Sequence, residues 1–106
     1  MSTVSGLDPV IHAPARLQIA AILAMVDDAE FGMVRDAVGV SDSVLSKHLS
    51  ALTEAGYVKL RKAALDGRQR TWIILTREGR RAFAAHVKAL KALAAVAEQM
   101  SVEAAE

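Results

Sequence analysis

The stretch VSDSVLSKHLSALTEAGYVKL, residues 40–60, changes its apolar period part-way along, and this change constrains the fold more than any other feature. Leu45, Leu49 and Leu52 have the spacing of residues on one face of an α-helix. Beyond Gly56, apolar and basic residues alternate, which is the period of a β-strand. The stretch therefore predicts a helix with one buried face that ends at a glycine and leads directly into a strand.

The outward face of this helix, over about residues 42–55, carries small polar and basic side chains, with Ser41 or Asp42 as the expected N-cap. Short hydroxyl side chains allow close approach to a duplex, and a helix N-terminus offers free amide groups to a phosphate. An ordinary solvated face is the alternative, and for His48 a phosphate contact and packing against the turn are equally weighted. The candidate DNA contacts on this helix are Ser43, Val44, Ser46, Lys47, His48 and Ser50.

Two strand-like runs, YVKLRK and RTWIIL, are joined by a segment that contains the turn signal Asp66-Gly67. We therefore expect a β-hairpin with a basic tip, which could reach the DNA backbone or an adjacent minor groove. The alternative is that its arginines serve only solubility. The candidate DNA contacts on the hairpin are Arg61, Lys62, Arg68 and Arg70.

Two predicted helices precede this segment and one follows it. The first runs from Pro14 to about Val26, and the second is short and ends at Gly39, after an acidic loop. The last covers about residues 77–100, with Thr76 as its N-cap. The wide apolar faces of the first and last helices suggest that a second copy of the chain covers them. The expected dimer contacts are Ile19, Ile22, Val26, Val87, Leu90 and Ala94.

Together these elements predict a mainly α-helical domain with a small β-hairpin wing, a winged helix-turn-helix. A chain of 106 residues is long enough for one such domain and too short for two. We expect the domain at residues 7–100, a flexible N-terminus at 1–6 and a frayed tail at 101–106. With no signal-peptide layout and no run of 18 apolar residues, we expect a cytoplasmic protein without a membrane partner.

Charge and residue types narrow the function further. The net charge of +1 hides nine basic and four acidic residues in the segment 41–81, which contains the predicted helix and hairpin. The chain has no cysteine, and none of its three histidines is followed by a second ligand three or four positions further along the chain, so we expect no metal site. It has no glycine-rich phosphate loop and no catalytic serine motif, so we expect neither an enzyme nor a cofactor.

The segments VSDSVLSKHLSALTEAGYVKLRK and DGRQRTWIILTREGRRAF resemble winged-helix regulators of the MarR and ArsR type. The opening LDPVIHAPARLQIAAIL resembles the compact winged-helix transcriptional regulators within that group, and the resemblance covers about residues 7–97. It implies a DNA-binding homodimer, usually a repressor, joined through its first and last helices. The positions that match the recognition helix are Ser43, Ser46, Lys47 and His48, and those that match the wing are Arg68 and Arg70.

The chain also departs from this group. It lacks the cysteines and the paired acidic and histidine ligands of ArsR-type metal sensors, and it is shorter than a typical MarR member. The shorter length suggests that the usual effector pocket is missing. An apolar pocket at the dimer interface could still hold a small-molecule effector, but no convergent polar group identifies one. The main alternative to a DNA-binding regulator is a winged helix used for protein interaction, because the fold alone does not determine function.

Overall fold

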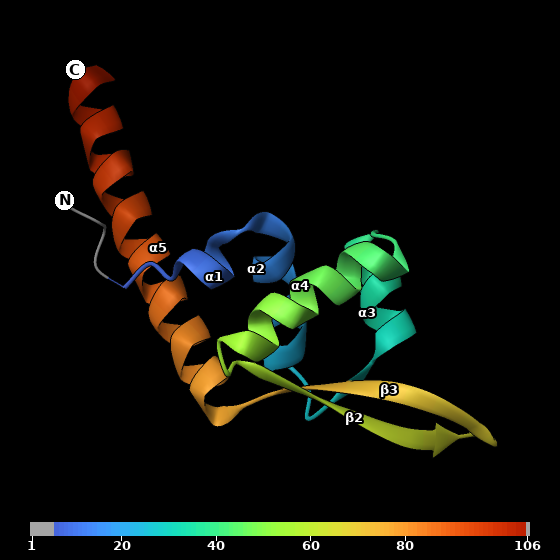
Figure 1. Ribbon diagram of the computed structural model, residues 1–106. Helices are drawn as coiled ribbons and strands as arrows, with labels where there is room; N and C mark the ends of the chain where they lie inside the picture. The colour runs from blue at the N-terminus through green and yellow to red at the C-terminus, as the bar shows by residue number, and fades with distance from the viewer. Residues whose placement is uncertain (1–5, 106) are drawn as a thin grey trace.

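The computed structural model describes residues 6–105, and these residues form five helices and a three-stranded antiparallel sheet. The mainly helical class with a β-hairpin wing is confirmed. Residues 1–5, which make up most of the N-terminus expected to be flexible, lie outside the described residues, as does Glu106. The elements, in chain order, are α1 (Pro9–His12), α2 (Pro14–Ala24), β1 (Ala29–Glu30), α3 (Phe31–Val38), α4 (Asp42–Glu54), β2 (Val58–Leu65), β3 (Arg68–Leu75) and α5 (Arg77–Ala105) (Figure 1).

The core lies where α4 packs on α2, α3 and the sheet. Leu45, Leu49 and Leu52 are all buried, so the predicted inward face of α4 is confirmed. They form one cluster with apolar residues of the neighbouring elements. Ser41 caps α4 by accepting a hydrogen bond from the Val44 amide at 3.2 Å. These contacts fix which side of α4 remains available to a ligand.

The hairpin has the register that its two-residue turn requires. Asp66 and Gly67 both have positive φ, 52° and 77°, as in a type I′ turn between twisted strands. Lys62 on β2 lies opposite Thr71 on β3, and Arg61 lies opposite Trp72. Because successive strand residues point to opposite faces of a sheet, Lys62 and Arg61 face opposite sides of the hairpin.

Three element boundaries differ from the predictions. The acidic segment predicted as a loop contains β1, which pairs with Ile73 and Trp72 of β3; a strand of two residues is too short to show a period in sequence. Helix α2 ends at Ala24 instead of Val26. Helix α5 continues to Ala105, so residues 101–105, which we expected to fray, are helical in the structure.

A close junction joins Tyr57, just before β2, to the start of α5. The Tyr57 carbonyl accepts a hydrogen bond from the Thr76 amide at 2.9 Å, and the Thr76 hydroxyl donates to the Gly56 carbonyl at 2.7 Å, with the Tyr57 oxygen 3.1 Å away. The Thr76 hydroxyl oxygen also accepts a bond from the Gly79 amide, so the predicted cap of α5 is confirmed. A Cβ atom on Gly79 would lie 2.2 Å from the Tyr57 oxygen. Only glycine therefore lets the first turn of α5 approach this carbonyl.

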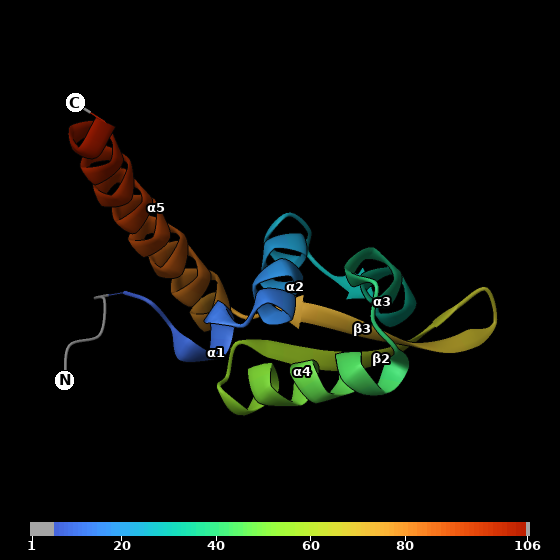
Figure 2. The same ribbon diagram turned by 90° about the horizontal axis from the view of Figure 1, so that it is seen from above.

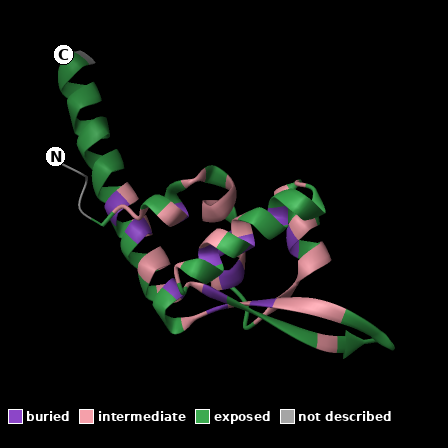
Figure 3. Cartoon of the chain, in the orientation of Figure 1, coloured by how far each residue is buried: buried purple, intermediate pink, exposed green. Residues whose placement is uncertain are grey.

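Helix α5 extends well beyond the rest of the domain (Figures 1 and 2). The molecule measures 63 × 24 × 22 Å, and every described side chain from residue 91 to residue 104 is exposed (Figure 3). Its described residues contain no helix with both the length and the apolar character needed to cross a membrane. The protruding half of α5 has no covering element within the part of the chain that the structure describes.

We predict that Gly79→Ala destabilises the fold by about 1 to 3 kcal/mol, because the added methyl group overlaps the Tyr57 carbonyl. At an ordinary helical position the same change stabilises the fold by roughly 1 kcal/mol. The sign of the change in unfolding free energy therefore shows whether the Tyr57 carbonyl lies this close. Urea denaturation measures the difference, with Ala84→Gly on the exposed side of α5 as a control for helix propensity. Unchanged or increased stability in Gly79→Ala would contradict the close approach.

Candidate nucleic-acid interface

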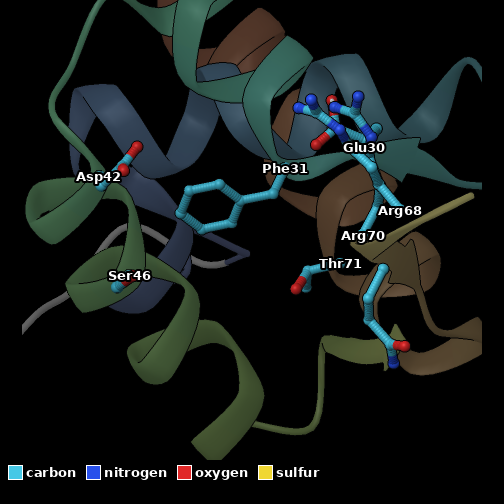
Figure 4. Close-up of a pocket in the computed structure, with 8 residues that line it drawn as sticks. Glu30, Phe31, Asp42, Ser46, Arg68, Arg70 and Thr71 are labelled. Carbon is cyan, nitrogen blue, oxygen red and sulfur yellow. Dashed lines mark ion pairs between the residues drawn. The ribbon is translucent and has the colours of Figure 1, made fainter. Parts of the chain in front are cut away.

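A groove separates the recognition helix α4 from the hairpin. It consists of two adjoining hollows that share Phe31, Ser46 and Thr71, and we call it the wing groove. Figure 4 shows Ser46 on the α4 side and Thr71 on the strand side, with the Phe31 ring between them. Five of the predicted contacts line the wing groove: Ser46, Ser50, Lys62, Arg68 and Arg70.

Three further predicted contacts, Ser43, Val44 and Lys47, are exposed on α4 beside the wing groove. The face that they form with Ser46 and Ser50 consists of short polar side chains, one lysine and one valine. Such a face can approach base edges closely and donate hydrogen bonds to phosphates. The structure therefore brings most of the predicted α4 contacts together on one open surface.

The four predicted hairpin contacts fall into different environments. Arg68 is exposed near the tip, whereas Arg61 donates to the Asp28 carboxylate at 2.7 Å on the face away from Lys62. Arg61 is therefore neutralised and lies outside the wing groove. Sequence alternation alone could have separated Arg61 from Lys62, but the partner Asp28 comes from the segment before β1 and is visible only in three dimensions.

Arg70 lies beside an acidic residue in the wing groove. Its Nη1 is 3.9 Å from Glu30 Oε1, and the Glu30 side chain is only 13% exposed. The other carboxylate oxygen of Glu30 accepts a hydrogen bond from the Gly32 amide at 2.8 Å, which caps α3. Within the described residues, the buried Nε of Arg70 has no hydrogen-bond partner. Arg70 thus lies beside Glu30 at the start of α3 (Figure 4), and Arg68 is the more exposed of the two arginines.

His48 packs toward the inside of the domain. Arg16 Nη1 lies 3.3 Å from His48 Nδ1, and the Arg16 Nε donates to the Val10 carbonyl. Burial, followed by the nearby charges of Arg16 and Lys47, lowers the pKa of His48. A neutral His48 can accept from Arg16, so this geometry favours the packing alternative for His48.

Arg35 is a basic residue at this surface that the sequence did not single out. It donates to Asp42 at 2.8 Å and to Asp36 at 2.9 Å, and thereby ties α3 to the first turn of α4. Its hydrogen bond holds the pKa of Asp36 below the usual range. Thr71 was also missed, although the two-residue turn places it opposite Lys62 and so could have identified it.

Two histidines that are far apart in sequence meet in space. His12 Nδ1 and His86 Nε2 lie 3.3 Å apart. The Asp8 amide donates to His86 Nδ1 at 2.9 Å, so the proton of a neutral His86 is on Nε2, which donates to His12. A protonated nitrogen cannot ligate a metal ion, and residues 6–105 contain no group of three or more His, Asp or Glu suited to one.

The predicted dimer contacts differ in exposure. Ile19 is fully buried in the core of its own chain and offers no free surface, whereas Ile22 packs against that core and is half-buried. Val87 and Leu90 are half-buried, whereas Val26 and Ala94 are exposed. Three larger exposed apolar residues of α5 are on a neighbouring stripe, namely Leu93, Val96 and Met100, whereas Val102 is exposed on another side of the helix.

The core face of α5 continues into this exposed stripe. His86, Leu93 and Met100 are seven residues apart, as are Ala89 and Val96, and both His86 and Ala89 are buried. A heptad spacing of this kind keeps side chains on one face of a helix. The seven-residue spacing is therefore visible in the sequence. Only the structure shows that the described part of α5 beyond Leu90 is exposed, and this exposure distinguishes the stripe of Leu93 and Val96 from the predicted contacts Val87 and Leu90.

The sequence profile of the winged helix DNA-binding domain family matches residues 15–94. An uncharacterized protein of Methanocaldococcus jannaschii is 32% identical over 74 residues, which cover 70% of this chain and 80% of that protein. The structure of a transcriptional regulator homologue from Pyrococcus horikoshii OT3 superposes with a TM-score of 0.75 at 27% identity, over 79% of this chain and 83% of the other.

Regulators of the MarR type share the fold at lower identity. MepR of S. aureus, solved as a complex with DNA, gives a TM-score of 0.71 at 19% identity over 94% of this chain and 81% of that one. PcaV of Streptomyces coelicolor, solved with its natural ligand, gives 0.72 at 20% identity over 92% and 72%. The predicted resemblance is confirmed: the chain belongs to the winged helix DNA-binding domain family and has the fold of the MarR-type regulators.

Proposed function

We propose that this protein is a sequence-specific, double-stranded DNA-binding transcriptional regulator that acts as a homodimer and represses its targets. The observation that carries the proposal is the exposed α4 face beside the wing groove. Lys47 is exposed on this face, Arg68 and Lys62 each line one of the two hollows of the wing groove, and none of the three forms an ion pair with any other described residue. Their charges are therefore available to phosphates without displacing an acidic partner.

The shape of the surface supports a defined docking geometry. Helix α4 would enter the major groove as the recognition helix, and the hairpin beside it would contact the DNA backbone or the adjacent minor groove. Ser43 and Ser46 would contact base edges or backbone, while Lys62 and Arg68 would bind phosphates. The wing groove between them would then hold the DNA backbone that separates the two grooves.

A second copy would cover the exposed stripe of α5. Leu93, Val96 and Met100 are 45%, 57% and 64% exposed, which is unusual for large apolar side chains in neighbouring turns of one helix. Ala94 is exposed beside the stripe, and Val26 is exposed near the first turns of α5, where its carbonyl accepts a hydrogen bond from Arg80; we propose both as further dimer contacts. A two-fold pair of α4 helices would then read an inverted repeat with half-sites about one helical turn apart.

The solved relatives indicate what else to test. MepR was solved with DNA and PcaV with its natural ligand, and both have this fold. We extend the first property to this chain and treat an effector as a further possibility, without assigning its chemistry. A protein-interaction module is the alternative; Val44, 40% exposed, is the one large apolar residue of the outward α4 face among the described residues, which favours DNA over protein.

Selection from a pool of random duplex DNA, repeated at several salt concentrations, tests the main proposal. We expect an inverted repeat to be enriched and its affinity to fall steeply with salt, because phosphate contacts release counterions. Placing the enriched sequence across a promoter should lower transcription when the protein is present. Salt-dependent binding without enrichment, or no binding at low salt, would contradict sequence-specific regulation.

Two lysines on β2 form a matched pair for the wing groove. Lys62→Ala should weaken binding to all sequences and reduce the slope of log K against log salt by about 1, because one phosphate contact is lost. Lys59→Ala removes the same charge from the opposite face of the hairpin and should change the slope far less. Equal effects of the two substitutions in fluorescence-anisotropy titrations would show that the wing groove does not face DNA.

A charge placed on the exposed stripe should prevent dimerisation. Val96→Glu would bury a carboxylate at the proposed contact, so we expect a monomer by light scattering at about 10 µM. Ala95→Glu, on another side of the same helix turn, should remain a dimer. If Val96→Glu is as dimeric as the unaltered protein, the proposed interface is wrong.

A further inference from the structure

A polar network joins three elements at the base of α5. Asp8, the N-cap of α1, accepts hydrogen bonds from the Val10 and Ile11 amides through Oδ1. Its other carboxylate oxygen accepts the hydroxyl proton of Tyr57. Its own amide donates to Nδ1 of His86 on α5, a side chain with no exposed surface. Asp8 therefore connects α5 to Tyr57, which comes three residues after the end of the recognition helix α4.

The network requires neutral imidazoles. His86 accepts from Asp8 at Nδ1 and donates from Nε2 to His12, so a second proton on His86 would point at an amide hydrogen. A second proton on His12 would likewise occupy the nitrogen that accepts from His86. Protonation of either ring breaks a contact between α1 and α5.

Helix α1 is placed to transmit such a break. It packs against both α4 and α5, and Figures 1 and 2 show it between them. Tyr57 is held on two sides, through its hydroxyl by Asp8 and through its carbonyl by Thr76. When the α1–α5 contact is lost, Asp8 still holds the Tyr57 hydroxyl but is no longer tied to His86, so the bond from Thr76 alone links Tyr57 to α5.

We propose that His12, His86, Asp8 and Tyr57 form a proton-sensitive positioning link between α5 and the recognition helix, and that acid weakens DNA binding by releasing it. The inference rests on the DNA-binding function proposed above. It goes beyond that function because the four residues lie outside the wing groove and would act by setting the position of α4.

The pKa shifts of the groups in the link agree with its release in acid. Burial, followed by the charge of His12, lowers the pKa of His86, against the opposing effect of Asp8. The hydrogen bond with Asp8 and burial raise the pKa of Tyr57 to about 12, with a smaller contribution from Glu78 of α5. Because the folded state disfavours a proton on His86 that the unfolded state accepts, stability should decline as the pH falls below about 6.5.

Simple electrostatics predicts the opposite trend for DNA binding. Protonation of His48, which lies beside Lys47 on α4, adds positive charge near the DNA face and should tighten binding in acid. A loss of affinity in acid therefore distinguishes the positioning link from a general charge effect. His48→Gln removes the competing titration and makes the loss easier to measure.

The test measures affinity for the selected duplex between about pH 7.5 and pH 5.5, in the His48→Gln background and at constant ionic strength. We expect at least about a fivefold loss of affinity in acid, the lower end of common coupling between sites. His86→Gln, which cannot titrate, should abolish the pH dependence. Tyr57→Phe should leave the His86 titration visible by NMR but uncouple it from DNA affinity.

A measurement on the free protein, without DNA, distinguishes a failure of the positioning link from a failure of the proposed DNA-binding function. In the free protein, the Tyr57 amide resonance should shift with the His86 titration and should not shift in His86→Gln. Equal affinity at both pH values, or an equal acid loss in His86→Gln, would overturn the inference. Linked resonances with no DNA binding at any pH would instead refute the DNA-binding function and the part of the inference that depends on it.

Discussion

The close contact between Tyr57, just before β2, and the first turn of α5 positions the hairpin and α5 relative to α4. The Tyr57 carbonyl accepts a hydrogen bond from the Thr76 amide, and Gly79 allows the α5 backbone to lie against it. This contact fixes where the hairpin begins and ends, since β2 starts just after Tyr57 and β3 ends just before Thr76. It also sets the direction in which α5 leaves the domain. The position of the wing relative to α4 and the location of the exposed stripe both follow from it.

The surface that we propose for DNA is defined as much by paired charges as by free ones. Arg61 is held by Asp28 and Arg70 by Glu30, while Lys62 and Arg68 remain unpaired among the described residues. The acidic partners come from the segment around β1, which lies at the edge of the sheet beside β3. An excess of basic residues in one part of the sequence therefore overstates the number of cations available to phosphate, because the fold neutralises some of them with acids from elsewhere.

Much of the fold was predictable because local patterns agreed with each other. The leucine spacing of α4, the Asp-Gly turn and the cap at Thr76 each correspond to the observed element. The predictions failed where a feature depends on distant residues: β1 has no period of its own, His12 and His86 meet only through the packing of α1 on α5, and Ile19 is enclosed by the core. For the candidate site, the sequence indicated the exposed face of α4 and the hairpin beside it, and strand alternation separates Arg61 from Lys62. The pairing of Arg61 with Asp28 required the structure.

We propose that the wing groove faces DNA in a two-fold complex. Cleavage of bound DNA by a reagent tethered at the wing groove measures this arrangement. The chain has no cysteine, so Gln69→Cys at the rim of the wing groove gives a single attachment point for an iron chelate that cuts nearby DNA. The account predicts cuts at two positions related by the symmetry of the selected inverted repeat, and none from the same reagent at Ala95→Cys on α5. Bound protein that cuts at no defined position from Gln69→Cys, or that cuts from Ala95→Cys instead, would contradict it.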